Sequence, residues 1–262
     1  MTTEAVEALR ADRQALLAMA ETFTADEWEA PSDCAGWRVQ DVVAHLAQVF
    51  RQMVDPGSLP PGDPSGQTER NQDRYVDAMR SLTPQEVLEE YRSLGEQALA
   101  GLEGIQGVES EISMGDLGRY PLHMVANAFA FDHYTHIRVD ILRPTGPIDR
   151  EPPPSDDLRL GAALDWMLAG LPQMTPGAFD WLDAEVNLTL DGPGGRSVHV
   201  SPCEGSIEVR DGEGPAGVAS VHSVTTDFVV WATKRRDWRT LPVRVEGRTD
   251  LAERFCDSVH VF

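Results

Sequence analysis

Apolar side chains recur at helical spacing along the first half of the chain. Their three- and four-residue intervals predict four long helical regions, which span residues 4–23, 37–54, 67–101 and 119–142. The third region contains a break at "SLTPQEV", where Thr83 can cap a helix and Pro84 can occupy its first turn. Four long helices with apolar faces are typical of an all-α four-helix bundle.

The pattern changes in the second part of the chain. One helix is predicted over residues 158–174, and short runs with alternating apolar positions follow it. These runs are residues 184–190, 197–202, 206–210 and 217–221, and Gly-rich turns such as "DGPGGR" separate them, as in β-hairpins or a meander. Helical spacing returns at residues 225–238 and 249–262, with a strand-like run at residues 241–247 between them. This mixture predicts a smaller C-terminal α+β domain, with strands on one side and helices on the other.

A Pro-rich polar segment, residues 143–157, separates the two patterns. Its composition is that of an inter-domain linker, so we expect two domains, residues 1–148 and residues 149–262. A second Pro- and Gly-rich segment, residues 55–66, predicts a long loop after the second helical region. A loop of this length is more often functional or mobile than a tight turn would be.

Composition and charge narrow the range of partners. The 262 residues are 41% hydrophobic and 25% charged, as in a folded globular protein. The net charge of −21 repels phosphate backbones and anionic lipids, so nucleic acid and membrane partners are not expected. No run approaches the roughly 18 apolar residues of a membrane span, no signal peptide is recognised, and three widely spaced cysteines make no disulfide framework. We therefore expect a cytoplasmic protein, with a monomer as the default state.

His45 lies within the apolar stripe of the second helical region, between Val42 and Val49. A bundle interior is a costly place for an imidazole without a partner, so His45 is either a hydrogen-bonded core residue or a metal ligand. Asp41 precedes it by about one turn and could orient its second nitrogen. The alternative, which we favour for Asp41, is an acidic residue stabilised near the helix N-terminus by the helix dipole.

The stretch "FAFDHYTHIRVD", residues 129–140, contains a second pair of candidate ligands. Asp132 and His136 are four residues apart, so both project from one face of a helix and could reach one cation. His133 points about 100° away and His123 faces roughly the opposite side, so neither joins this pair. An i,i+4 ion pair between Asp132 and His136 is the alternative interpretation.

The run "WEAPSDCAGWRVQDVVAHL" resembles the N-terminal signature of the mycothiol-dependent maleylpyruvate isomerase family, which belongs to the DinB-like superfamily. The residues that match are Trp28, Ser32, Cys34, Gly36, Trp37, Val39, Asp41, Val42, Ala44, His45 and Leu46. The C-terminal run "VRVEGRTDLAERFCDSVHVF" is similar to the end of the family's second domain. The resemblance therefore implies a DinB-like helical bundle followed by a smaller domain of the sterol-carrier-protein type.

The resemblance also implies a metal site. In the family, a histidine of the second helix joins a carboxylate and a histidine four residues apart on the last bundle helix, and together they bind a divalent metal, usually zinc. The matching positions are His45, Asp132 and His136. The family's carboxylate is typically glutamate, so the shorter Asp132 must bring the helix closer, bind through a water or bind more weakly. A degenerate site without metal is the alternative that this substitution leaves open.

The same resemblance implies mycothiol, the sugar-linked thiol of actinobacteria, as cosubstrate. Three protein ligands leave one position of zinc open, and a thiol that enters it is deprotonated by the cation. Addition of the sulfur to an electron-poor carbon of a small electrophile then supports isomerisation or S-transfer. Arg70 and Asn71, just after the long loop, are candidates to anchor a polar cosubstrate, or are ordinary residues of a helix start.

Other polar residues carry weaker signals. Cys34 could be a nucleophile, but it has no companion pattern, and we favour packing beside Trp37. The basic run "ATKRRDW" could face an anionic substrate, although a solvated helix end is the favoured interpretation. His199 and His222 lie in separate strand-like runs and suggest no catalytic set.

Three functional hypotheses follow. The leading one is a cytoplasmic divalent-metal enzyme that uses mycothiol in isomerisation or thiol transfer. The second is a small-molecule or stress-related binding protein with a degenerate site, and the third is a metal-dependent hydrolase in which water takes the open position. Two imidazoles and a carboxylate suit zinc, nickel and iron alike. The sequence therefore does not identify the metal, and it does not identify the electrophile either.

Overall fold

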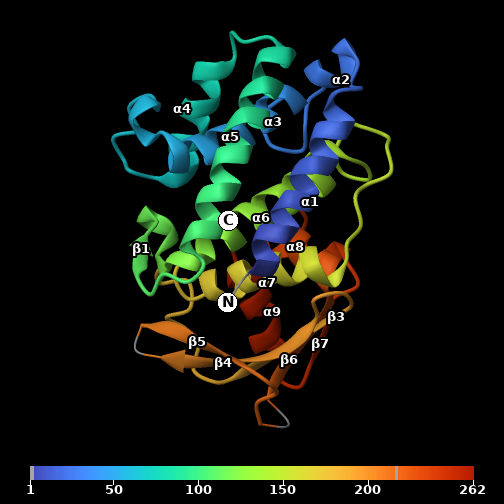
Figure 1. Ribbon diagram of the computed structural model, residues 1–262. Coiled ribbons are helices and arrows are strands. Elements are labelled where there is room, and N and C mark those ends of the chain that lie inside the picture. The colour runs from blue at the N-terminus through green and yellow to red at the C-terminus, as the bar shows by residue number, and fades with distance from the viewer. Residues whose placement is uncertain (1–2, 204, 216–217) are drawn as a thin grey trace. The chain divides into compact units, whose positions relative to one another are not determined.

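Helices account for most of the N-terminal part of the chain in the computed structural model, which describes residues 3–203, 205–215 and 218–262 (Figure 1). The α-helices here are α1 (Thr3–Ala20), α2 (Ala25–Glu29), α3 (Val39–Val54), α4 (Thr68–Met79), α5 (Pro84–Ile105) and α6 (Val125–Thr135). A π-helix, His136–Ile141, continues α6, and short 3-10 helices are formed by Pro56–Ser58, Gly115–Leu117 and Leu122–Met124. Strands β1 (Glu111–Ser113) and β2 (Arg119–Pro121) form a small two-stranded sheet.

The chain divides into two compact units. One consists of residues 1–116 and 120–154, and the other of residues 117–119 and 155–262. The main passage from the first unit to the second therefore lies within the Pro-rich segment. Each unit has a buried apolar core, with Leu9, Leu46 and Leu102 in the first and Val200, Trp231 and Phe255 in the second.

Helix α3 is the central helix of the first unit. It packs against α4, α5 and α6, and every residue from Val39 to Phe50 is buried. Helix α1 packs against α5 and α6. The predicted apolar stripes supply these contacts, but polar side chains such as His45 are buried along with them. A buried imidazole needs a partner, which makes the surroundings of α3 the place to look for a site.

The predicted break in the third helical region is confirmed. Helix α4 ends at Met79 and α5 begins at Pro84. The Thr83 hydroxyl accepts the Glu86 N–H at 3.3 Å, and the Glu86 carboxylate accepts the Thr83 N–H at 2.7 Å. This reciprocal pair satisfies two N–H groups that the first turn would otherwise leave without acceptors.

The fourth predicted helical region, residues 119–142, is wrong at its start. Residues 119–121 are extended, and α6 begins only at Val125. Tyr120 precedes Pro121, and the residue before a proline is disfavoured in the α conformation. The end of the region is helical as expected up to Ile141, but the six residues His136–Ile141 adopt the wider π-helical hydrogen bonding.

The second unit contains α7 (Asp157–Gly170), α8 (Thr225–Ala232) and α9 (Thr249–Ser258), a 3-10 helix at Trp238–Thr240 and a five-stranded sheet. The strands are β3 (Val186–Asp191), β4 (Arg196–Cys203), β5 (Ser206–Asp211), β6 (Ala219–Val224) and β7 (Arg244–Glu246). Their order in the sheet is β5-β4-β3-β6-β7. Helices α8 and α9 pack against β3 and β6, which covers the apolar face of the sheet.

The prediction of hairpins or a meander is right for β3, β4 and β5, which pair antiparallel in sequence order. It is wrong for β6, which pairs parallel with β3, so that Val186 lies opposite Ala219. Alternating apolar residues indicate which face of a strand is buried, but they do not indicate its neighbour. The predicted run 217–221 begins at Gly217, which lies outside the described residues.

None of the described helices combines the length and the apolar character that crossing a membrane requires.

Candidate functional site

The three predicted metal ligands lie together inside the first unit. His45 is on α3, Asp132 is on α6, and His136 is the first residue of the π-helix. One potential ligand atom from each lies within 4.8 Å of the other two. The rings of His45 and His136 meet edge to face, with their centroids 4.8 Å apart. The structure therefore brings all three together from segments about ninety positions apart in the sequence.

Local geometry accounts for this convergence. Asp132 and His136 share one helix face because four residues make about one turn. The packing of α3 against α6 and the π-helix brings His45 to that face. His45 and His136 are 6% and 8% exposed, while Asp132 is half-buried. The site is therefore shielded, with its carboxylate nearest to solvent.

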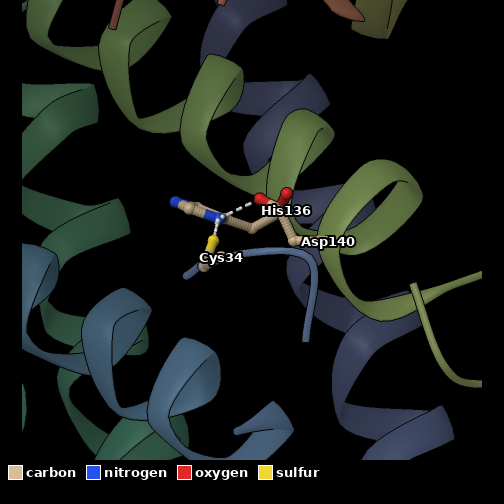
Figure 2. Close-up of side chains that lie close together, drawn as sticks. All are labelled: Cys34, His136 and Asp140. Carbon is tan, nitrogen blue, oxygen red and sulfur yellow. Dashed lines mark hydrogen bonds and ion pairs between the residues drawn. The ribbon is translucent and has the colours of Figure 1, made fainter. Parts of the chain in front are cut away.

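His136 also belongs to a second cluster, with Cys34 and Asp140 (Figure 2). Its Nδ1 lies 2.7 Å from Asp140 Oδ2 and 3.7 Å from Cys34 Sγ. Both dashed lines in Figure 2 meet at this nitrogen, and the other ring nitrogen points away from both partners. Because the carboxylate can only accept, Nδ1 carries the proton, and in the neutral ring Nε2 carries the free lone pair.

This second cluster is not a nucleophilic triad. In a triad, the acid holds Nδ1 while the nucleophile contacts Nε2, so that the ring relays a proton between them. Here Asp140 and Cys34 contact the same nitrogen. The arrangement instead matches the carboxylate–histidine pair that fixes the orientation and tautomer of a metal-binding imidazole.

Opposite pKa shifts distinguish the two histidines. Burial, together with the neighbouring His136 and His133, lowers the pKa of His45 well below its usual value, and an interaction with Gln72 only partly opposes this. Burial also acts to lower the pKa of His136, but hydrogen bonds to Asp140 and Cys34 outweigh it and raise that pKa to about 10. At neutral pH, His45 is therefore ready to donate a lone pair, whereas a cation on His136 must displace a proton.

The residues present fit a divalent metal. His45 Nδ1 is buried and has no hydrogen-bond partner among the described residues. An orphaned imidazole nitrogen beside a second imidazole and a carboxylate is costly in a protein interior unless something binds it. Two nitrogens and one oxygen are donors that zinc and similar cations accept, and three protein ligands are typical of sites that leave a position open.

Cys34 is held in place by a tight turn. Its N–H is bonded to the Ser32 hydroxyl at 3.2 Å, and its carbonyl accepts the Trp37 N–H at 3.0 Å. The Asp33 N–H donates to the Asp140 carbonyl at 3.0 Å, which ties the turn to the π-helix. The favoured interpretation of Cys34, packing beside Trp37, therefore misses its main contact, since Sγ lies against His136.

The favoured interpretation of Asp41 agrees with its contacts. Its carboxylate accepts the Arg38 N–H at the start of α3 and pairs with the guanidinium of Arg38 at 3.0 Å and of Arg80 at 3.7 Å. Asp41 therefore stabilises the helix N-terminus and the adjoining turn. These partners occupy the carboxylate, so it does not orient His45.

Arg70 and Asn71, the predicted cosubstrate anchors, lie near the start of α4. Arg70 is exposed, and the Asn71 side-chain oxygen accepts the Asp63 N–H at 2.6 Å. Asn71 thus fastens the long loop to α4. Contact of either residue with a cosubstrate stays a prediction.

The remaining polar residues of the sequence analysis lie elsewhere. His133 is buried in the helical core, where its Nδ1–H donates to the Phe129 carbonyl at 2.7 Å. In the run "ATKRRDW", Lys234 donates to the Cys256 and Asp257 carbonyls at the end of α9. This contact agrees with the favoured helix-end interpretation. His199 Nε2 lies 3.4 Å from a Glu185 carboxylate oxygen, in the second unit.

Sequence reasoning missed two members of the clusters. Asp140 follows His136 by four residues, the same spacing that singled out Asp132, so the rule already applied to this stretch could have found it. Cys34 is 102 positions from His136. No local pattern reports a contact of that separation.

The fold and the clustered side chains define a protein whose helical unit holds a candidate metal centre with a cysteine beside it. Residues 9–114 match the family model of the "Mycothiol maleylpyruvate isomerase N-terminal domain". This part of the chain is therefore similar to that domain, and the resemblance inferred from the sequence is confirmed over these residues. The match includes Cys34 and His45 and ends before Asp132, His136 and Asp140.

Two solved structures are similar to nearly the whole chain. The crystal structure of the mycothiol-dependent maleylpyruvate isomerase aligns with a TM-score of 0.55 at 14% identity, and that of its histidine-to-alanine mutant with 0.53 at 13%. Each alignment covers 94% of this chain and 93% of the other. A helical N-terminal part followed by a sheet-containing part is thus the fold that the two proteins share. No curated protein sequence matches the chain.

Proposed function

We propose that the protein is a divalent-metal-dependent enzyme that uses a low-molecular-weight thiol, mycothiol, for isomerisation or S-transfer on a small electrophile. The observation that carries the proposal is the convergence of His45, Asp132 and His136 within 4.8 Å. The family of the N-terminal domain supports mycothiol as the thiol. The names of the two similar structures support a maleylpyruvate-like electrophile, although at 13–14% identity they share the fold alone.

His45, Asp132 and His136 would hold the metal, and zinc is the first candidate because its catalytic sites use three such ligands. When bound, the cation lowers the pKa of a thiol and so supplies a strong sulfur nucleophile at neutral pH. Asp140 keeps the proton on Nδ1 of His136 and so leaves the Nε2 lone pair available to bind the cation. The buried walls around His45 and His136 limit the entry of water, which would compete with the thiol.

Finer features of the architecture belong to the same proposal. We assign the helices of the first unit to a DinB-like four-helix bundle and the second unit to the sterol-carrier-protein type. The domain division at residues 1–148 and 149–262, the cosubstrate contacts of Arg70 and Asn71, the cytoplasmic location and the monomeric state are retained as predictions.

The test is thiol-dependent turnover by the full chain supplied with zinc, mycothiol and a panel of small electrophiles that includes maleylpyruvate. We expect turnover that requires both zinc and mycothiol and that His45→Ala and His136→Ala abolish. His222→Ala is a matched control, because His222 lies on β6 in the other unit. Ligand binding without any turnover would replace the proposal by a binding protein, and turnover independent of thiol would replace it by a hydrolase.

A further inference from the structure

Three buried polar atoms in the core of the first unit lack a hydrogen-bond partner among the described residues. They are Nε of Arg13, the hydroxyl oxygen of Tyr91 and Nε2 of His133. Arg13 is 6% exposed, and Tyr91 and His133 are 0% exposed. Buried polar atoms in folded proteins are nearly always hydrogen-bonded, because an unpaired one loses its bonds to water without replacement. If these three side chains lie together, they point to a bound polar molecule.

The three side chains come from different helices and meet around the ring of Phe50. Arg13 is on α1, Phe50 on α3, Tyr91 on α5 and His133 on α6. The rings of Tyr91 and His133 are stacked with their centroids 5.8 Å apart, and the Phe50 ring lies 5.5 Å from the first and 5.1 Å from the second. Arg13 joins them at Gly95, since Arg13 Nε and Phe50 Cε2 lie 2.2 and 2.9 Å from the point that a Cβ on Gly95 would occupy. The three unpaired atoms therefore belong to one cluster.

The other hydrogen bonds of these side chains fix what each unpaired atom can do. The His133 Nδ1–H donates to the Phe129 carbonyl at 2.7 Å, so Nε2 of the neutral ring offers a lone pair. One terminal nitrogen of Arg13 donates to the Arg92 carbonyl at 2.5 Å, whereas its Nε–H is an unpaired donor within the described part of the chain. The Tyr91 hydroxyl can donate or accept. The cluster thus presents one acceptor, one donor and one group that does either.

We propose that the cluster of Arg13, Tyr91 and His133 is a binding site for one buried water molecule, which bridges helices α1, α5 and α6. The water oxygen accepts the Arg13 N–H and the Tyr91 O–H, and the water donates one hydrogen to His133 Nε2. Three hydrogen bonds are typical of buried waters in globular proteins. The inference does not depend on a metal or on the proposed function, because none of the three side chains is a candidate metal ligand.

The chemistry of the cluster favours water over an ion. An anion such as chloride needs a donor from every group, and His133 could donate from Nε2 only as a charged ring in a fully buried position, which burial opposes. A cation would face the guanidinium of Arg13. Water both donates and accepts, so it satisfies all three atoms at the same time.

The bridge has a consequence for α6, which carries Asp132 next to His133. Helix α6 packs against α1, and a water that bonds His133 to Arg13 and Tyr91 adds directional contacts to α1 and α5. A buried polar network whose members are all satisfied rigidifies the core around it. The water therefore helps to hold α6, and Asp132 with it, in one orientation.

A crystal structure of the full chain, at a resolution that shows ordered waters, tests the site directly. We expect one water within hydrogen-bond distance of Arg13 Nε, the Tyr91 hydroxyl and His133 Nε2. A direct hydrogen bond between two of these groups, an ion in the same place, or a cluster without any bound molecule would overturn the inference.

Tyr91→Phe is a second test, in solution, in which the sign of the effect decides. Phenylalanine keeps the stacked ring and removes only the hydroxyl. If the hydroxyl is bonded to a water, its removal loses that bond, and the melting temperature of the full chain should fall by about 2–4 °C. An unpaired hydroxyl predicts the opposite sign, because Tyr91→Phe would then remove a polar group that is costly to bury.

Tyr75→Phe is the matched control, because Tyr75 is a half-buried tyrosine on α4, outside the cluster. Its melting temperature should equal that of wild type. A melting temperature of Tyr91→Phe that is equal to or above that of wild type would show that no water is bonded to the Tyr91 hydroxyl.

Discussion

His136 is the residue on which the site depends most. Its Nδ1 is bonded to Asp140, its ring contacts His45, and Cys34 lies beside it. These contacts leave one orientation for the ring. An imidazole fixed in this way can offer Nε2 to a cation without first losing side-chain freedom.

Asp140→Asn tests this role of the carboxylate. The amide fills the same space but removes the negative charge that holds the proton on Nδ1 of His136, so zinc affinity should fall about 10- to 100-fold. Isothermal titration with zinc measures the change. Glu69→Gln, an exposed carboxylate at the start of α4, is the control and should bind zinc like wild type. Equal affinities of Asp140→Asn and wild type would contradict the role assigned to Asp140.

His133 makes the fold sensitive to acid. Burial lowers its pKa to about 3, and the hydrogen bond to the Phe129 carbonyl only partly opposes that effect. As the pH falls, His133 therefore becomes protonated near pH 6.5 in the unfolded chain but only near pH 3 in the folded chain. The free energy of unfolding should fall as the pH is lowered through this interval, by an amount on the order of a few kcal/mol.

Urea unfolding of the metal-free protein at a series of pH values measures this dependence. His133→Gln removes the titrating group and keeps an amide that can donate a hydrogen bond, so its stability should vary less with pH between 3 and 6.5. An identical pH slope in the two proteins would show that His133 is not the cause.

At the scale of elements, two glycines of α5 make a matched pair. A Cβ on Gly95 would lie 2.2 Å from Arg13 Nε and 2.9 Å from Phe50 Cε2, whereas a Cβ on Gly104 would meet nothing within 4 Å. Gly95 therefore allows α1 and α3 to pack closely on α5. Phe50 is fully buried and Arg13 nearly so, which leaves both little room to move.

Gly95→Ala should lower the free energy of unfolding by about 1–3 kcal/mol because it overpacks this contact. Gly104→Ala, on the same helix, should leave stability unchanged or raise it by about 0.5–1 kcal/mol through its better helix propensity. Urea denaturation of both variants at one pH measures the difference. A Gly95→Ala variant as stable as Gly104→Ala would show that the helices adjust without cost.

The sequence predicted the helices and strands better than it predicted which of them pair or pack together. Helical periodicity, the Thr83 cap and the Pro84 first turn are local features, and these predictions agree with α4 and α5. The parallel pairing of β3 with β6 was missed because strand alternation carries no information about the neighbour. The late start of α6 was missed because the apolar periodicity was followed through Pro121.

The residues of the candidate site show the same difference between local features, which the sequence predicts, and tertiary contacts, which it does not. The pair Asp132 and His136 could be read from a four-residue spacing, and the pair His136 and Asp140 could have been read in the same way. The prediction of His45 as a third ligand needed the family resemblance, since its contact with His136 depends on how α3 packs. The Cys34 contact depends on a turn whose closure is visible only in three dimensions.

At the scale of the whole molecule, the protein combines a net charge of −21 with a candidate site that itself contains the carboxylates of Asp132 and Asp140. Such a field attracts cations and raises their local concentration. A metal that binds only the folded chain also stabilises it, by about 2.7 kcal/mol when the free metal is at 100 times its dissociation constant. Zinc should therefore raise the melting temperature of the full chain, and a chelator should reverse the effect.

The most direct test of the account is a zinc titration of the metal-free full chain and of three single variants, His45→Ala, Asp132→Ala and His136→Ala, with His222→Ala as the control. The account predicts one zinc ion per chain for wild type and His222→Ala, and loss of this binding in each of the other three. Wild-type protein that binds no zinc, or three variants that bind it as wild type does, would contradict the claim that these side chains form a metal centre.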